Sequence, residues 1–269
     1  MILIPPMLIA IYLFLIVPRV TKRPDVTPLL GTHYAHRGLH DNSSDAPENS
    51  MAAFRKAVDA GYGIELDVQL TRDRIPVVFH DETLDRVCGV SGKVRDFTFE
   101  ELQQFSLCNS QEHIPLFSDF LKLVDGKVPL IVEIKIHEKA SVVCEKADEL
   151  LRDYKGVYCV ESFHPYAMKW YKEHRPHVVR GQLSTSFNNP FKKESLPQNA
   201  VHYLLTNFLC RPDFIAYDHR HRYNISRLAC QIFRPLNVTW TIKSQAQLDA
   251  CRKDFDLFIF EGFIPSDYS

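Results

Sequence analysis

The sequence from about residue 32 onward alternates regularly between short apolar runs and stretches with the spacing of helices. Runs such as 63–71 and 129–135 have the length of buried strands, whereas 49–61 places apolar residues at helical spacing and ends in a glycine. Such alternation implies parallel strands joined by crossover helices. About eight such units in a chain of 269 residues favour a closed barrel over an open sheet. We therefore predict an α/β fold, a (β/α)₈ TIM barrel that occupies residues 32–269.

The end of the chain leaves little room for the last helix of such a barrel. The final apolar run covers residues 256–262, and the sequence ends at Ser269. We therefore expect the last helix to be short or missing. The linker that precedes the first strand is a candidate to cover that side of the barrel.

The first 17 residues form the most apolar segment of the chain. No charged side chain occurs from Ile2 to Val17, a length close to the ~17–25 residues that span a bilayer. A secretory signal is less favoured, because no basic residue precedes the run and no small-residue cleavage site follows it. By the positive-inside rule, the basic residues after the run place the rest of the chain on the cytoplasmic side; they are Arg19, Lys22 and Arg23. We expect a hydrophobic anchor helix at 1–17, which spans the bilayer or lies in its interface, and a linker at 18–31.

Charge and cysteine content narrow the possible partners. The chain has 32 basic and 33 acidic residues, so its composition does not favour a nucleic-acid partner. Its seven cysteines are scattered and include no CxxC pair, which argues against a disulfide framework and against a zinc site. We interpret them as buried thiols in a reducing compartment, in agreement with a cytoplasmic location. The sequence leaves the oligomeric state open.

Three acidic residues occur near the ends of predicted strands. Glu65 and Asp67 are two positions apart, so both carboxylates project from the same face of their strand. Glu133 and Lys135 repeat this spacing in another strand. Two carboxylates on one inward face repel each other unless a cation is present. Three converging carboxylates would suit Mg²⁺ or Ca²⁺, although solvated strand-end acids would explain each residue taken alone.

Two histidines follow other apolar runs. His36 precedes Arg37 after the first predicted strand, and His80 ends the run 75–80. Histidine can transfer protons near neutral pH, and the planar guanidinium of Arg37 can donate two hydrogen bonds to a phosphate. A lone histidine is more often an ordinary surface or core residue than a catalyst, and an ordinary surface salt bridge would explain Arg37. Only the combination of these residues indicates chemistry.

The order of these residues resembles the glycerophosphodiester phosphodiesterase family, in its bacterial membrane-anchored type. The motifs that carry the resemblance are HRG at 36–38, PENS at 47–50, ExD at 65–67, HD at 80–81 and EIK at 133–135. The resemblance is dense from Tyr34 to about Leu102 and thinner through Trp240-Thr241 to the last predicted strand. Any one of these motifs would be weak, but together they are specific.

The resemblance implies a metal-dependent phosphodiesterase on a barrel of the phospholipase C-like type, acting on a small-molecule glycerophosphodiester. A divalent metal would bind three carboxylates: Glu65, Asp67 and Glu133. An acid/base pair would be formed by His36 and His80. Substrate contacts would come from Arg37, Lys135 and Trp240, and Glu48 would order its loop. The products would be glycerol 3-phosphate and an alcohol, formed through a cyclic phosphate when the glycerol's own 2-hydroxyl attacks.

Two positions depart from the family's pattern. Phe260-Glu261 replaces the Thr-Asp pair that usually ends the last strand, and Lys243 replaces an asparagine after the tryptophan motif. We expect these changes to affect substrate preference, with Lys243 either solvated or in contact with a second anionic group. A second metal site at 218–221 is not expected, because adjacent strand residues point to opposite faces. Two other functions stay open: a lysophospholipase D-like lyase that leaves a cyclic phosphate, and an inert membrane-tethered binding barrel.

Overall fold

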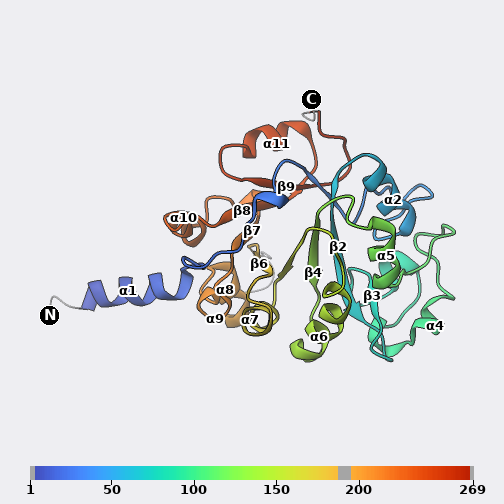
Figure 1. The fold of residues 1–269 in the computed structure, drawn as a ribbon, viewed down its shortest axis with the longest axis horizontal. Helices are drawn as coiled ribbons and strands as arrows, with labels where there is room; N and C mark the ends of the chain where they lie inside the picture. Colours follow the sequence, from blue (N-terminus) through green and yellow to red (C-terminus); the bar gives the residue numbers. More distant parts are fainter. Residues whose placement is uncertain (1–3, 187–194, 267–269) are drawn as a thin grey trace.

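Eight parallel strands form a closed barrel in the structure, a computed structural model that describes residues 4–186 and 195–266 (Figure 1). The strands of the barrel are β1 (Tyr34–His36), β2 (Gly63–Leu70), β4 (Leu130–Ile134), β5 (Tyr158–Ser162), β6 (Val179–Ser184), β7 (Phe214–Asp218), β8 (Leu236–Ile242) and β9 (Leu257–Phe260). β1 pairs in parallel with β2 on one side and with β9 on the other, which closes the barrel. The predicted (β/α)₈ barrel is therefore confirmed, while the domain boundary at residue 32 stays a prediction.

An excursion between β2 and β4 interrupts the strand–helix alternation. β3 (Pro76–Val78) runs antiparallel to β2, with Val68 opposite Val78. The excursion also contains the short helices α3 (Asp85–Cys88) and α4 (Phe99–Leu102) and the 3-10 turn η2 (Val94–Asp96). Its apolar side chains form a small core of their own, which is separate from the barrel core. This support places the end of β3, and His80 after it, beside the barrel mouth.

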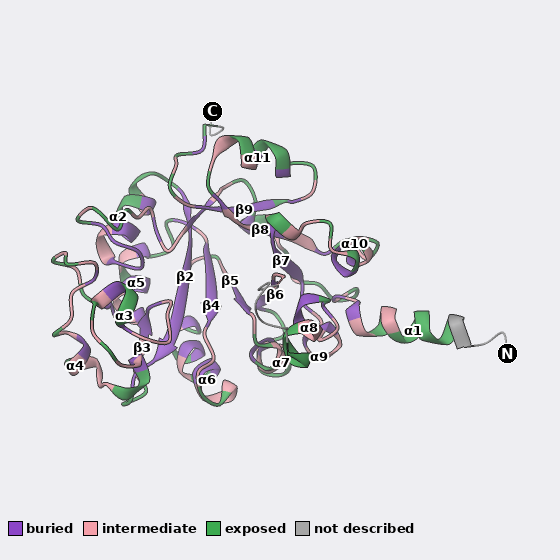
Figure 2. Cartoon of the chain, turned by 180° about the vertical axis from the view of Figure 1, so that it is seen from behind, coloured by how far each residue is buried: buried purple, intermediate pink, exposed green. Residues whose placement is uncertain are grey.

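The remaining helices pack around the barrel wall. They are α2 (Met51–Asp59), α5 (Phe117–Val124), α6 (Ala140–Leu151), α7 (Pro165–His174), α8 (Leu196–His202), α9 (Asn207–Cys210), α10 (Ile225–Gln231) and α11 (Gln245–Cys251). Figure 2 shows buried strands surrounded by helices whose outer faces are exposed. The sequence around residue 50 explains why α2 begins there. The side chain of Ser50 accepts a hydrogen bond from the backbone amide of Ala53, which satisfies a free donor of the first turn.

The linker closes the N-terminal end of the barrel. Its 3-10 turn η1 (Thr27–Leu29) places Leu29 against residues at the starts of the strands, and the carbonyl of Leu29 accepts a hydrogen bond of 2.7 Å from the hydroxyl of Tyr34. The expectation that the linker covers the side of the last helix is therefore wrong. No helix follows β9 within the described residues, as expected, and Phe263 packs there on Phe260, which also contacts Tyr62.

The apolar N-terminal segment forms α1 (Ile4–Ile16), which projects away from the barrel (Figure 1). Only its C-terminal end is docked: Ile16 is fully buried, and its carbonyl accepts a hydrogen bond of 2.8 Å from Asn207. The exposed apolar side chains of its first turns are Met7, Leu8, Ile9 and Ile11. Within residues 4–186 and 195–266, no helix has both the length and the apolar character needed to cross a membrane. The spanning helix expected from the sequence is thus not found in the described part of the chain.

Candidate active site

Three buried carboxylates converge where β1 and β4 end, on these strands' neighbour β2 and on β4 itself. The parallel register places Asp67 opposite Glu133, and Glu65 lies two residues earlier on the same face of β2. One oxygen from each of Glu65, Asp67 and Glu133 lies within 4.8 Å of the others. The structure therefore brings together the three residues predicted to bind a metal, on the barrel face where the active sites of this fold occur.

Lys135 and a further acidic residue complete this cluster. The Lys135 Nζ atom lies 2.7 Å from Glu133 Oε2 and 3.0 Å from Asp67 Oδ1. Glu161 of β5 lies opposite Glu133 in register and is also buried. Glu161 was not among the predicted site residues, although the run Val-Glu-Ser at the end of β5 repeats the Val-Glu-Ile at the end of β4. That repetition is the sequence signal that could have indicated it.

The charges of this cluster do not balance. The cluster contains four buried carboxylates but only two cationic side chains in ion pairs with them among the described residues, Lys135 and Arg37. The carboxylates are those of Glu65, Asp67, Glu133 and Glu161. Burial, together with the neighbouring carboxylates, raises the pKa of Glu65 and of Glu161 well above the usual value. A divalent cation would supply the missing positive charge, and carboxylate oxygens are the donors that Mg²⁺ and Ca²⁺ prefer. The residues present therefore fit the metal that the family resemblance implies.

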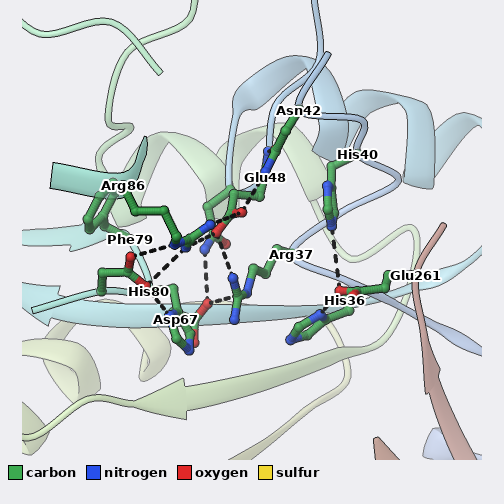
Figure 3. A network of polar contacts seen from close by, with 12 residues as sticks. His36, Arg37, His40, Asn42, Glu48, Asp67, Phe79, His80, Arg86 and Glu261 are labelled. Carbon is green, nitrogen blue, oxygen red and sulfur yellow. Dashed lines mark hydrogen bonds and ion pairs between the residues drawn. The ribbon is translucent and has the colours of Figure 1, made fainter. Parts of the chain in front are cut away.

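Arg37 is held at the edge of the cluster by Glu48. The Arg37 NH1 atom lies 2.6 Å from Glu48 Oε1, and its Nε atom lies 3.5 Å from Asp67 (Figure 3). Glu48 is buried and also accepts hydrogen bonds from Arg86 and Asn42. Although burial opposes ionisation, these donors lower the pKa of Glu48 to about 2. Glu48 is therefore an ionised anchor for the arginine that was predicted to contact phosphate.

His80 follows β3 and is oriented by Asp81. The His80 Nδ1 atom lies 2.5 Å from Asp81 Oδ1, and Arg86 donates hydrogen bonds to the same carboxylate. The backbone carbonyls of Phe79 and Asp81 accept hydrogen bonds from Gln69 of β2. These contacts fix the ring of His80 and leave its Nε2 atom as the nitrogen available to a substrate.

His36 ends β1 on the other side of the cluster. Its Nδ1 atom lies 2.5 Å from Glu261 Oε2, and its Nε2 atom lies 3.8 Å from Glu65 Oε2. Burial and the nearby Arg37 lower the pKa of His36 to about 4, against the opposing effect of Glu261. Glu261, which the sequence marked as a departure affecting substrate preference, is therefore in direct contact with the predicted catalytic histidine. The Lys243 Nζ atom lies 2.6 Å from the other oxygen of Glu261.

Trp240 lies in the wall of a polar cavity of about 480 Å³ that most of these groups line. Its ring meets Phe163 edge to face, with ring centroids 5.7 Å apart. Of the eight predicted site residues, six line this cavity: His36, Arg37, Glu65, His80, Glu133 and Trp240. Asp67 and Lys135 are not among its lining residues, whereas Lys243 is. The run 218–221 was considered above as a second metal site. Its Asp218 forms an ion pair of 2.6 Å with Arg220, and none of the clusters of possible metal ligands among the described residues includes this run.

Fold and site together define a TIM-barrel protein with a candidate cation site at the C-terminal ends of its strands. Within this class, the chain belongs to the glycerophosphoryl diester phosphodiesterase family, whose family model matches residues 36–221.

Known proteins of this family align with part of the chain. A glycerophosphodiester phosphodiesterase of Caldanaerobacter subterraneus is 37% identical over 163 residues, which are 55% of this chain and 65% of that enzyme. Glycerophosphodiester phosphodiesterase 1 of Homo sapiens is 42% identical over 100 residues, 37% of this chain and 28% of the human protein. The chain thus spans less than two thirds of the relatives' length in these alignments.

Solved structures share the fold over a longer range. A phosphodiesterase of Oleispira antarctica, determined with the product sn-glycerol-3-phosphate, superposes with a TM-score of 0.70 over 86% of this chain and 93% of that one, at 22% identity. A glycerophosphodiester phosphodiesterase of Thermotoga maritima gives a TM-score of 0.63 over 86% and 94%, at 24% identity. At this level of identity the likeness establishes the barrel fold.

Proposed function

We propose that this protein is a metal-dependent phosphodiesterase that hydrolyses glycerophosphodiesters to glycerol 3-phosphate and an alcohol. The observation that carries the proposal is the convergence of Glu65, Asp67 and Glu133 in a buried cluster with more carboxylates than cationic side chains. Family membership and the names of the aligned relatives support the same activity.

The metal, Mg²⁺ or Ca²⁺, would be bound by Glu65, Asp67 and Glu133. When bound, it would offset the negative charge that builds on the phosphate oxygens in the transition state. Arg37 and Lys135 each place a cationic donor beside Asp67. A phosphate bound to the metal would therefore lie close to both side chains, which would donate hydrogen bonds to its nonbridging oxygens. Glu48 keeps Arg37 in this position.

His36 and His80 would transfer the protons of the reaction. In each histidine a carboxylate contacts Nδ1, which favours the tautomer with the proton on that nitrogen and leaves Nε2 free to exchange protons. One histidine would take the proton of the attacking hydroxyl, and the other would protonate the leaving alkoxide. Their placement on opposite sides of the carboxylate cluster suits these two separate roles.

We further propose that α1 attaches the protein to a membrane, with the barrel on the cytoplasmic side. The exposed apolar side chains of α1 and the basic residues after it support this proposal; the latter are Arg19, Lys22 and Arg23. Flotation of the full chain with vesicles containing anionic lipid would test it. Flotation should be abolished by Leu8→Asp combined with Ile11→Asp, and an unchanged result would contradict the attachment.

The activity is tested with the full chain after treatment with a chelator. Release of glycerol 3-phosphate from glycerophosphocholine and glycerophosphoethanolamine is measured with and without added Mg²⁺ or Ca²⁺, and phosphorus NMR detects cyclic phosphate. Metal-dependent release of glycerol 3-phosphate would support the hydrolase, whereas accumulation of cyclic phosphate alone would indicate the lyase. The absence of any turnover would leave an inert binding barrel and contradict the proposal.

A further inference from the structure

A second group of possible metal ligands lies where β1 and β9 end side by side. It consists of His36, His40 in the loop after β1, and Glu261 after β9. One ligand atom of each residue lies within 4.8 Å of the others, and all three residues line the polar cavity (Figure 3). The group shares no residue with the cluster of three carboxylates. A cation that enters the cavity can therefore reach two different sets of ligands.

The imidazole of His40 is the least satisfied member of this group. Both of its ring nitrogens are buried, and neither has a hydrogen-bond partner among the described residues. The Nε2 atom lies 3.8 Å from Glu261 Oε2, which is too far for a hydrogen bond. Buried polar atoms of folded proteins nearly always have a partner, and an unpaired one costs free energy. His40 therefore offers a lone pair to a ligand that the described chain does not supply.

Glu261 presents the same oxygen atom to both histidines. Its Oε2 atom lies 2.5 Å from His36 Nδ1 and 3.8 Å from His40 Nε2, while its Oε1 atom is paired with Lys243. The ligand atoms of a tetrahedral zinc ion, at bond lengths of about 2.0–2.2 Å, lie about 3.3 Å from one another. Shifts of about 1 Å or less would therefore bring the three atoms around one ion, with the fourth position open to the cavity.

The two sets of ligands differ in the metal that they prefer. Imidazole nitrogens suit Zn²⁺ and neighbouring transition metals, whereas carboxylates suit Mg²⁺ and Ca²⁺. Two histidines and one glutamate also form known zinc sites with an open fourth position. We propose that His36, His40 and Glu261 form a second metal site, selective for Zn²⁺ over Mg²⁺, and that zinc bound there inhibits the enzyme. The inference rests on the proposed phosphodiesterase function, because it concerns the regulation of the same site.

Inhibition follows from the place of His36 between the two sets of ligands. Its Nδ1 atom faces Glu261, and its Nε2 atom lies 3.8 Å from Glu65 Oε2. Zinc on Nδ1 takes the lone pair of that nitrogen, so the proton of the neutral ring moves from Nδ1 to Nε2. The ring can then neither accept a second proton nor release the remaining one near neutral pH. His36 is thereby lost as a proton-transfer group, whereas a cation on the carboxylates leaves both ring nitrogens free.

Zinc binding is measured by calorimetry on the full chain in lipid nanodiscs, with Mg²⁺ or Ca²⁺ at saturation to occupy the carboxylates. The affinity for Zn²⁺ should fall by about tenfold or more in His40→Ala and in His40→Gln, because each removes one of three ligands. His113→Ala, which changes an exposed histidine, is the matched control. Zinc affinity that both His40 variants leave unchanged would overturn the inference.

Cobalt identifies the ligand atoms. Co²⁺ in place of zinc should give the visible absorption of a tetrahedral site, and His40→Ala should remove it. Sulfur-to-cobalt charge-transfer bands should be absent, since the half-buried thiols of Cys88 and Cys108 are not part of the proposed site. Such bands in place of a His40-dependent spectrum would assign the metal to the thiols and contradict the proposal.

Activity assays connect the second site with inhibition. With the activating cation at saturation, His40→Ala should raise the zinc concentration for half inhibition by about tenfold or more. Without zinc, the variant should keep kcat/KM within about twofold of wild type, because His40 has no part in the proposed chemistry. Inhibition that added Mg²⁺ relieves equally in both proteins would place zinc on the carboxylates and overturn the inference alone. His40-dependent zinc binding by a chain that cleaves no diester would support the second site, and only the proposed function would fail.

Discussion

The two halves of the barrel mouth differ in how their polar groups are paired. On the side of β1, β2 and β3, Glu48 and Asp81 are joined by the guanidinium of Arg86, and each carboxylate has further partners. On the side of β4 to β6, Glu161 is buried with one carboxylate oxygen that has no partner among the described residues. A second cavity of about 530 Å³, lined mainly by apolar side chains, begins beside it, at Phe163.

This difference separates two tasks within one site. A network of fixed, paired charges needs little reorganisation when charge develops on a ligand, so the half at β1 to β3 suits the reacting phosphate. An apolar wall discriminates ligands by size and hydrocarbon content, so the half at β4 to β6 suits the part of the substrate that does not react. Changes in the charged network, or in Glu133 of β4 and Lys135 after it, should therefore reduce turnover of every substrate, whereas changes in the apolar wall should alter preference.

The largest effect is expected from the carboxylate cluster. Asp67→Asn removes a charged oxygen ligand, so kcat/KM should fall by about 10³-fold or more and the affinity for Mg²⁺ or Ca²⁺ should fall with it. Turnover and calorimetric metal titration measure the two quantities. Asp59→Asn, an exposed carboxylate at the end of α2, is the matched control. A variant that keeps normal metal affinity would show that the cluster is not the metal site.

His80→Ala should cost about 10²- to 10⁴-fold in kcat, because it removes a proton-transfer group without removing a carboxylate. Metal affinity should stay close to that of wild type, and added imidazole should restore part of the activity. The control is His113→Ala, an exposed histidine whose Nδ1 atom lies 3.0 Å from the backbone carbonyl oxygen of Phe105. Loss of metal binding in His80→Ala would instead indicate that His80 acts through the metal.

The sequence predicted the barrel and placed the main site residues because both depend on local pattern. Strand–helix alternation fixes the number of parallel strands, and an inward-facing residue at the end of a barrel strand must point into the mouth. Strand positions allowed Glu65, Asp67 and Glu133 to converge, and the family resemblance supplied their assignment as one metal site; the register of β2 with β4 places Asp67 beside Glu133.

The contacts that the sequence did not predict join segments far apart in the chain. Glu261 reaches His36 across 225 positions because β9 closes against β1, and sequence pattern does not specify how two loop ends approach after closure. The position of Leu29 at the N-terminal end of the barrel was not predicted either. A short apolar turn in a linker has no periodicity from which its packing partners could be predicted. Glu161 was missed although its local signal was present.

Glu48→Gln should lower the free energy of unfolding by about 2–3 kcal/mol at pH 7, since the folded-state pKa of about 2 lies below the usual 4.5. A depressed folded-state pKa means that the ionised form favours the folded state. The difference between wild type and variant should therefore be complete above about pH 4.5 and disappear as the pH falls toward 2. Urea denaturation at several pH values measures it, with Glu100→Gln, an exposed residue of α4, as the control. A difference that does not change with pH would point to packing instead of charge.

The smallest effect is expected at Lys243, and its direction sharpens the comparison between the two halves. The Lys243 side chain is 63% exposed and pairs with Glu261. Because ion pairs of exposed side chains are weak, this one should contribute little to stability or to the geometry of the site. Lys243→Gln should change kcat/KM for glycerophosphoethanolamine by less than about threefold. A selective loss of about tenfold for glycerophosphoserine, whose headgroup carries a carboxylate, would show that Lys243 binds a second anionic group. In that case the side of β8 and β9 would also select the headgroup, and preference would not belong to the apolar half alone.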